Sequence, residues 1–293
     1  MKSSNPVFSR RGFSRGAGAG GNGEPAASGP VARVNPYAGV TSLRKGAVIP
    51  EGEAAQDVRP QVSGDVMTMD DVVLRTTLAL GTVVLAAVLS WVLLPVNEGS
   101  ILMSYGIAIG AALLAVALSL IQSFKSRPSP ALILGYAAFE GVFLGVISNA
   151  VSTHISSGVV VQAVLGTMAV FAGVLIAYKL RWIRVTRRFY GFVMAAAVGF
   201  LLLTMANLLF SAFSAGDGLG FRSGGLGILF GIIGVILGAS FLALHFKQVE
   251  DGITHGAPGE ESWLAAFGLT LTLVWIYVEA LRLLTLLQED DSW

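Results

Sequence analysis

Long apolar stretches separated by short polar segments fill residues 72–287 of the chain. A helix that crosses a bilayer needs about 20 apolar residues, because each residue adds about 1.5 Å of rise. Seven stretches reach that length, and each predicts a membrane-spanning helix. The predicted spans are 72–94, 101–121, 131–152, 158–178, 190–213, 224–246 and 263–287.

The predicted fold class is therefore all-α, a polytopic membrane protein. The loops between the spans are short, so successive helices are expected to be antiparallel neighbours in one seven-helix bundle. Composition agrees, because 54% of the residues are hydrophobic and only 13% are charged, whereas about a quarter are charged in soluble domains. The chain has no cysteine, which excludes disulfides and thiolate chemistry.

Residues 1–66 have a different composition, rich in Gly, Ala, Ser and Pro and without apolar periodicity. Such a segment buries too little surface to offset its conformational entropy. We therefore predict a disordered tail over 1–66 and a transmembrane domain over 67–293. Ordered structure is expected to begin at Thr68, which forms a capping-box pattern with Asp71.

Lys and Arg are concentrated in alternate loops. The tail carries eight, the first and third loops carry none, and the fifth carries only Arg222. The second and fourth loops hold Lys125, Arg127, Lys179, Arg181, Arg184, Arg187 and Arg188. The positive-inside rule then predicts a multi-pass protein of the plasma (inner) membrane, with a cytoplasmic N-terminus and an outside C-terminus.

Glycines recur at helical spacing in three of the predicted spans. Gly227, Gly231, Gly234 and Gly238 fall on one face of the sixth helix. The pairs Gly106–Gly110 and Gly141–Gly145 have the same small-xxx-small spacing. These faces permit close backbone approach, which we assign to packing within the chain in preference to dimerisation.

Among the side chains inside the apolar stretches, three ionisable ones are singled out: Glu140, His245 and Glu279. A charge in mid-bilayer costs about 2.5–3.5 kcal/mol, so such groups usually pair, line water or titrate. Glu140 lies about 13 Å into the third helix, and is either a buried protonated acid or a functional group. Glu279 has Arg282 three residues on, where it can neutralise the carboxylate. His245 is placed at the cytoplasmic end of the sixth helix, and an imidazole titrates near pH ~6.5.

These residues carry a resemblance to a known family. Three motifs resemble the Bax inhibitor-1 family of transmembrane proteins: Phe139-Glu140-Gly141 with Leu144-Gly145, the sixth-helix end with Glu250, and Tyr277-Val278-Glu279. The segments Ser4-Asn5-Pro6-Val7-Phe8 and Met69-Asp70-Asp71-Val72-Val73 resemble its long-tailed bacterial branch. The resemblance implies six helices around a central last helix, and a pH-sensitive calcium leak.

In that family two acids, one from each of the last two helices, are thought to gate the leak by sharing a proton or hydrogen bonds. This chain keeps the last-helix acid as Glu279 but has His245 at the other position, with Lys247 nearby. Calcium prefers oxygen ligands, so His245 and Lys247 make a poor calcium site. A His245–Glu279 pair can titrate, but it can form only if the sixth helix runs on towards Pro258.

The predicted function is a pH-responsive cation (calcium) leak without cofactors or a metal site, in which Ca²⁺ is the permeant ion. Glu279 is the expected gate, His245 its partner and Glu140 a second acid along the path. Glu250 and Asp251, with Asp70 and Asp71, either attract cations at the cytoplasmic mouth or are solvated helix ends. The alternative is a non-conducting regulator that binds another membrane protein, such as a quality-control protease, through the tail.

An enzyme is not expected, because the chain has no His-Glu-x-x-His, Gly-x-Ser-x-Gly or phosphate-loop motif. His154 and His255 fall in loops on opposite membrane faces. Net charge is +1, which gives no indication of a nucleic-acid partner, and the lipid bilayer is the partner that the spans imply.

Overall fold

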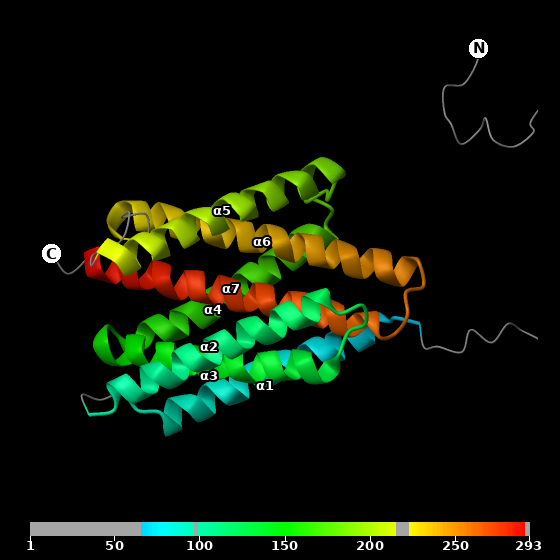
Figure 1. Ribbon diagram of the computed structural model, residues 1–293. Coiled ribbons are helices and arrows are strands. Elements are labelled where there is room, and N and C mark those ends of the chain that lie inside the picture. Colours follow the sequence, from blue (N-terminus) through cyan, green and yellow to red (C-terminus); the bar gives the residue numbers. More distant parts are fainter. Residues whose placement is uncertain (1–65, 97–98, 215–222, 291–293) are drawn as a thin grey trace, which may run out of the picture. The chain divides into compact units, whose positions relative to one another are not determined.

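Seven helices form the membrane domain in the computed structural model, which describes residues 66–96, 99–214 and 223–290 (Figure 1). All seven are long and apolar enough to cross a membrane, which confirms the all-α prediction. The predicted tail lies outside the described residues, up to residue 65. The helices are α1 (Met69–Leu93), α2 (Ile101–Phe124), α3 (Pro130–His154), α4 (Ser157–Lys179), α5 (Arg187–Ser214), α6 (Gly224–Thr254) and α7 (Glu261–Asp290).

The last helix is the central one. α7 packs against α1, α3, α4 and α6, and it has the largest buried share of the seven. α2 packs on α3 and α5 packs on α6, so these two helices lie further from α7. Four helices therefore pack directly on α7, whereas α2 and α5 form an outer layer.

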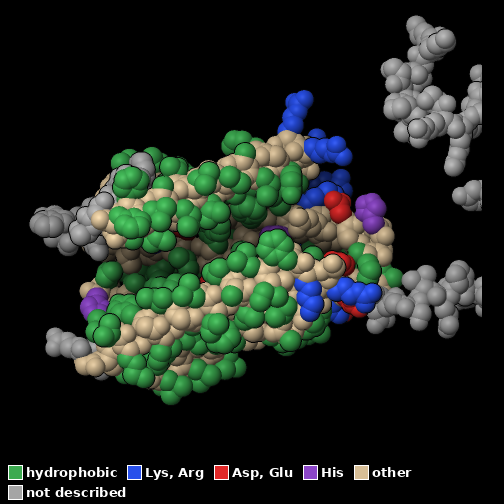
Figure 2. All heavy atoms as spheres, in the orientation of Figure 1, with side chains coloured by type: hydrophobic (Ala, Val, Ile, Leu, Met, Phe, Trp, Pro, Cys, Tyr) green, Lys and Arg blue, Asp and Glu red, His purple; other side chains and the backbone are tan. Residues whose placement is uncertain are grey.

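Lys and Arg side chains gather at one end of the bundle (Figure 2). This end, called the basic end here, carries the α2–α3, α4–α5 and α6–α7 loops. The opposite end, called the far end, carries the α1–α2 and α3–α4 loops, whose described residues contain neither Lys nor Arg. The charge asymmetry seen in the sequence is thus an asymmetry between two ends of the folded bundle.

α1 begins at Met69 as predicted, because Thr68 caps it. The Thr68 hydroxyl oxygen accepts a hydrogen bond from the Asp71 backbone N–H at 3.2 Å. The adjacent chain is fixed to the α6–α7 loop, where the Met67 N–H donates to the Ala257 carbonyl oxygen at 2.8 Å. The start of α1 is thereby attached to the hairpin that joins the last two helices.

α6 is longer than the sequence prediction, which ended it at residue 246. It continues to Thr254, because Lys247 forms ion pairs with Glu250 at 3.7 Å and with Asp251 at 2.7 Å on successive helical turns. Pairs at these spacings stabilise a helix beyond its apolar part. His245 therefore lies nine residues inside the helix and not at its end, which corrects the predicted position.

Glycines bring the backbones of α1 and α3 into contact. A Cβ at Gly141 would lie 2.4 Å from the Val83 carbonyl oxygen, and one at Gly145 would lie 2.3 Å from that of Ala87. The predicted close approach at Gly106–Gly110 is not formed, since no atom lies within 4 Å of a Cβ at either position. The α1–α3 contact thus depends on two glycines that the spacing had indicated.

We expect Gly145→Ala to destabilise the bundle by about 1–3 kcal/mol, because its methyl group would overlap backbone atoms that cannot rotate away. Gly110→Ala is the matched control, with open space around the added methyl group. Unfolding of the purified protein in mixed micelles, followed by circular dichroism, measures both. Equal stability of the two variants would contradict the close α1–α3 contact.

Candidate functional site along the α6–α7 seam

The interface between α6 and α7, called the seam here, contains the ionisable residues of both helices. Gly231, Gly234 and Gly238 of α6 all face α7 side chains. At Gly238 an added Cβ would lie 2.5 Å from Ile276 Cγ1. The glycine face predicted on the sixth helix is thus used for packing within the chain, as expected.

Glu279 and Arg282 form an ion pair inside the seam. Arg282 Nη2 and Nε donate to Glu279 Oε2 at 2.7 and 3.2 Å, and the side chains are only 16% and 8% exposed for Arg282 and Glu279. Arg282 thus forms with Glu279 the contact that their spacing on α7 allows. Arg282 Nη1 also donates to the Gly227 carbonyl oxygen at 3.4 Å, which joins the pair to α6.

Two glycines leave the space that this ion pair occupies. A Cβ at Gly234 would lie 3.1 Å from Glu279 Cδ, and one at Gly231 would lie 3.3 Å from Arg282 Nη2. A larger residue at either position would push the pair out of the seam or separate the helices. The local sequence of α6 therefore positions both charges of α7.

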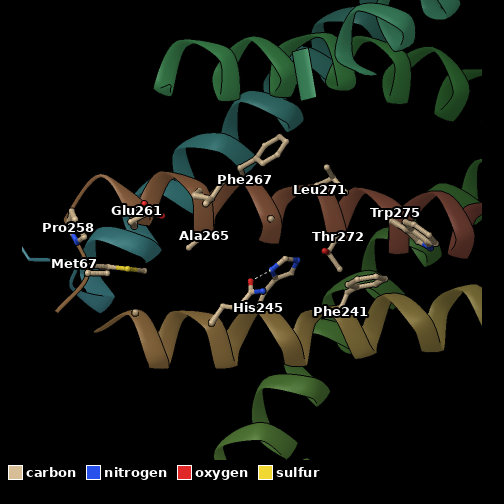
Figure 3. Close-up of a pocket in the computed structure, with 15 residues that line it drawn as sticks. Met67, Phe241, His245, Pro258, Glu261, Ala265, Phe267, Leu271, Thr272 and Trp275 are labelled. Carbon is tan, nitrogen blue, oxygen red and sulfur yellow. Dashed lines mark hydrogen bonds between the residues drawn. The ribbon is translucent and has the colours of Figure 1, made fainter. Parts of the chain in front are cut away.

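His245 lies at the other end of the seam, in a groove with a volume of about 710 Å³ (Figure 3). Its ring projects from α6 onto the backbone of α7, where a Cβ at Gly268 would lie 2.6 Å from His245 Cε1. His245 Nδ1 is 3.1 Å from Gln248 Oε1 and forms a hydrogen bond with it. The groove is mainly apolar, with Glu261 and Thr272 as its other polar side chains.

The structure does not bring His245 and Glu279 together. His245 is opposite Gly268, whereas Glu279 is opposite Gly234, so the contacts are 11 residues apart on each antiparallel helix. Eleven residues correspond to about 16 Å along a helix axis. α6 does run on towards Pro258, as the pairing hypothesis required, but the register of the two helices still separates the side chains.

Four aromatic rings form a chain of contacts from the groove to the level of the ion pair. Phe200 of α5 stacks on Phe230 with ring centroids 4.3 Å apart and contacts Trp275 at 5.6 Å. Phe241 lines the groove, and its ring centroid lies 6.2 Å from that of Trp275. In these rings, called the aromatic barrier here, Phe241 and Trp275 lie between the two polar regions of the seam.

Glu140 lies on a different face of α7 from the seam. It is half-buried on α3, one turn after Tyr136, whose ring contacts Phe267 at a centroid distance of 5.3 Å. One turn further on, Leu144 packs in a cluster with Val274. Glu140 thus belongs to the α3 stripe that faces α7, separate from Glu279 and His245.

The predicted mouth residues are placed at the basic end. Glu250 and Asp251 are about half-exposed and share Lys247 as an ion-pair partner. The Tyr178 hydroxyl of α4 also donates to Glu250. Asp70 and Asp71 lie in the first turn of α1. These carboxylates lie near helix ends, where Glu250 contacts α4, and Glu250 and Asp251 are balanced by Lys247.

One charged residue at the seam's basic end was missed in the sequence analysis. Arg75 of α1 donates to the Gly259 carbonyl oxygen and to Ser262 Oγ, and its guanidinium lies 5.4 Å from the Trp263 ring centroid. It therefore fixes α1 to the start of α7. The sequence did indicate a polar contact here, since Arg75 is a charged residue within the predicted span 72–94.

Comparison with protein families gives one match. A family model described as Bax inhibitor 1 like matches residues 5–289. No curated protein matches the chain. Within the described residues, no group of three or more His, Asp or Glu side chains is arranged to hold a metal ion.

We expect Arg282→Met to destabilise the protein by about 3–5 kcal/mol, because it leaves the buried Glu279 carboxyl without its guanidinium partner in the seam. Adding Glu279→Gln to this variant should restore much of the loss, since the uncompensated charge is then removed. A double-mutant cycle measured by unfolding in mixed micelles gives the coupling energy. Simple additivity of the two single substitutions would contradict the ion pair.

Proposed function

Since the family match extends over residues 5–289, the chain belongs to the Bax inhibitor 1 like family of integral membrane proteins, and we propose that it is a pH-responsive cation leak with calcium as the permeant ion. The observation that supports this proposal is the Glu279–Arg282 pair, a titratable acid and a fixed cation buried between two membrane-spanning helices. In this proposal the structure corresponds to a closed state.

Protonation of Glu279 opens the seam in this mechanism. The acid then carries no charge, while Arg282 keeps its charge in a nearly buried position. An unpaired buried charge is unfavourable by several kcal/mol, so states in which water reaches the guanidinium become more populated. Separation of α6 from α7 at Gly231 and Gly234 admits that water, and low pH therefore favours the open state.

The path runs along the seam from the groove at His245 to the ion pair. The aromatic barrier blocks this path in the closed state, and Phe200 and Trp275 must move apart for an ion to pass. His245 lies in the groove without contact to Glu279 and is proposed as a second pH-responsive group. Glu140 is proposed as a further acid near mid-depth, on the α3 side of α7.

A non-conducting regulator is the second candidate, and the charges of the seam favour it. Arg282 neutralises Glu279, and the groove carries His245 where an acid would attract calcium. A seam of this kind can respond to pH without conducting, by changing the surface offered to another membrane protein such as a quality-control protease. Deleting residues 1–66 then tests whether the tail carries that contact.

Reconstituted liposomes with an internal calcium dye distinguish the two candidates. We expect calcium flux to be several-fold higher at pH about 5 than at pH about 8, as a pH-responsive leak requires. Glu279→Gln, which mimics the protonated acid, should leak at pH 8 and respond little to pH. Glu260→Gln, at an exposed acid of the α6–α7 loop that lines neither groove, is the matched control and should behave as the parent protein does. Folded protein without flux at any pH would exclude the leak and leave the regulator.

We also propose that the basic end faces the cytoplasm of a plasma (inner) membrane. Lys125, Arg127, Lys179, Arg181 and Arg184 all lie in or beside the loops of this end, as the positive-inside rule requires of a cytoplasmic face. The C-terminus then lies outside.

Single cysteines test this orientation, because the parent chain has none. Ser126→Cys at the basic end should react with a membrane-impermeant maleimide only after the cells are opened. Ser157→Cys at the far end should react in intact cells. Both side chains are exposed, so the two sites are matched in access. The reverse pattern of labelling would show that the basic end lies outside.

A further inference from the structure

A second groove opens between α1 and α4 at the basic end of the bundle. α1 and α4 line its sides without packing against each other, while Phe246 of α6 and Leu269 of α7 contribute to its floor. Its volume is about 900 Å³. It shares no lining residue with the groove at His245, so it is separate from the proposed leak path.

The inner part of this α1–α4 groove is apolar. Leu80, Phe171 and Leu175 line it together with the floor residues. Phe171 precedes Lys179 by eight residues, so apolar surface continues for about 12 Å from the rim. Thr76 also lines the groove, and its hydroxyl is buried without a hydrogen-bond partner among the described residues.

The rim of the groove is cationic. Lys179, Arg181 and Arg184 line it and are exposed, and no ion pair connects them to a carboxylate within the part of the chain that the structure describes. The acidic rim residue, Glu250, already has Lys247 and the Tyr178 hydroxyl as partners. The rim therefore carries an excess of positive charge next to an apolar cavity.

The backbone at Arg181 adds a second indication. α4 ends in a motif in which the Arg181 N–H donates to the Tyr178 carbonyl and the Trp182 N–H donates to that of Ala177. This motif places Arg181 in the left-handed region, with φ of 58°, where glycine is the usual residue. An arginine in this conformation is strained, and such strain is concentrated at functional sites.

We propose that the α1–α4 groove binds an anionic phospholipid. The phosphate group contacts Lys179, Arg181 and Arg184, and one acyl chain lies along Phe171 and Leu175. The charge of the rim and the apolar depth are both required, so free phosphate satisfies only half of the site. A zwitterionic lipid fills the cavity but brings a cation to a cationic rim.

Native mass spectrometry of the purified full-length chain in mixed micelles tests the electrostatic part. Phosphatidylglycerol should be retained in preference to phosphatidylcholine. Each cation near an anionic lipid surface changes affinity by about fivefold, so replacing all three rim residues should weaken retention by about a hundredfold. The replacements are Lys179→Gln, Arg181→Gly and Arg184→Gln. Glycine at position 181 relieves the strained backbone, and the other two side chains are exposed, so the variant is expected to fold.

The control removes the two cations of the α2–α3 loop at the same end of the bundle, by Lys125→Gln and Arg127→Gln. These residues lie outside the groove, so retention of phosphatidylglycerol should be unchanged. An equal loss in the control would show only a general attraction of lipids to the basic end and would overturn the site. Absence of any preference for phosphatidylglycerol in the parent would overturn it as well.

The acyl-chain part is tested by filling the groove. Val73 lines it and is exposed, so Val73→Trp should lower retention of phosphatidylglycerol while leaving the cations in place. Val84→Trp is the control, on an exposed position of α1 outside the groove. Equal retention by both tryptophan variants would overturn the proposal that the chain of the lipid occupies this groove.

Discussion

The ion pair of Glu279 and Arg282 requires α6 and α7 to lie in close contact. Neither charge is tolerated alone at this depth, because an unpaired charge among apolar helices has no water to solvate it. The pair fits only because Gly231 and Gly234 carry no side chain, and Arg282 in turn reaches a carbonyl of α6. The seam and the pair therefore stabilise each other, and a change in one must change the other.

Close packing between helices also places α7 at the centre of the bundle. Small residues on α3 and α6 let helix backbones approach, and packing between them replaces the hydrophobic force that a bilayer does not supply. Arg75 attaches α1 to the start of α7 at the basic end, and the ion pair attaches α7 to α6 towards the far end. Between these two polar attachments Phe241 and Trp275 pack in the seam and separate its polar regions.

Much of the fold could be predicted from the sequence, because length and hydropathy are sufficient to identify a membrane-spanning helix. The α6 glycine face and the Glu279–Arg282 pair also followed from helical spacing alone. The end of α6 did not, since Lys247 and its two acids extend the helix beyond its apolar part. The position of His245 relative to Glu279 depends on the register between two helices, which spacing within one helix does not contain. That residues 1–66 form a disordered tail stays a prediction.

The coupling between the ion pair and the seam can be measured directly as a distance. Nitroxide labels at Leu226→Cys of α6 and Leu287→Cys of α7 lie on opposite sides of the seam near the far end, and both parent side chains are exposed. The account predicts that dipolar broadening decreases when the pH falls from about 8 to about 5, and that Glu279→Gln shows the weaker broadening already at pH 8. The same broadening in both proteins at every pH would contradict it.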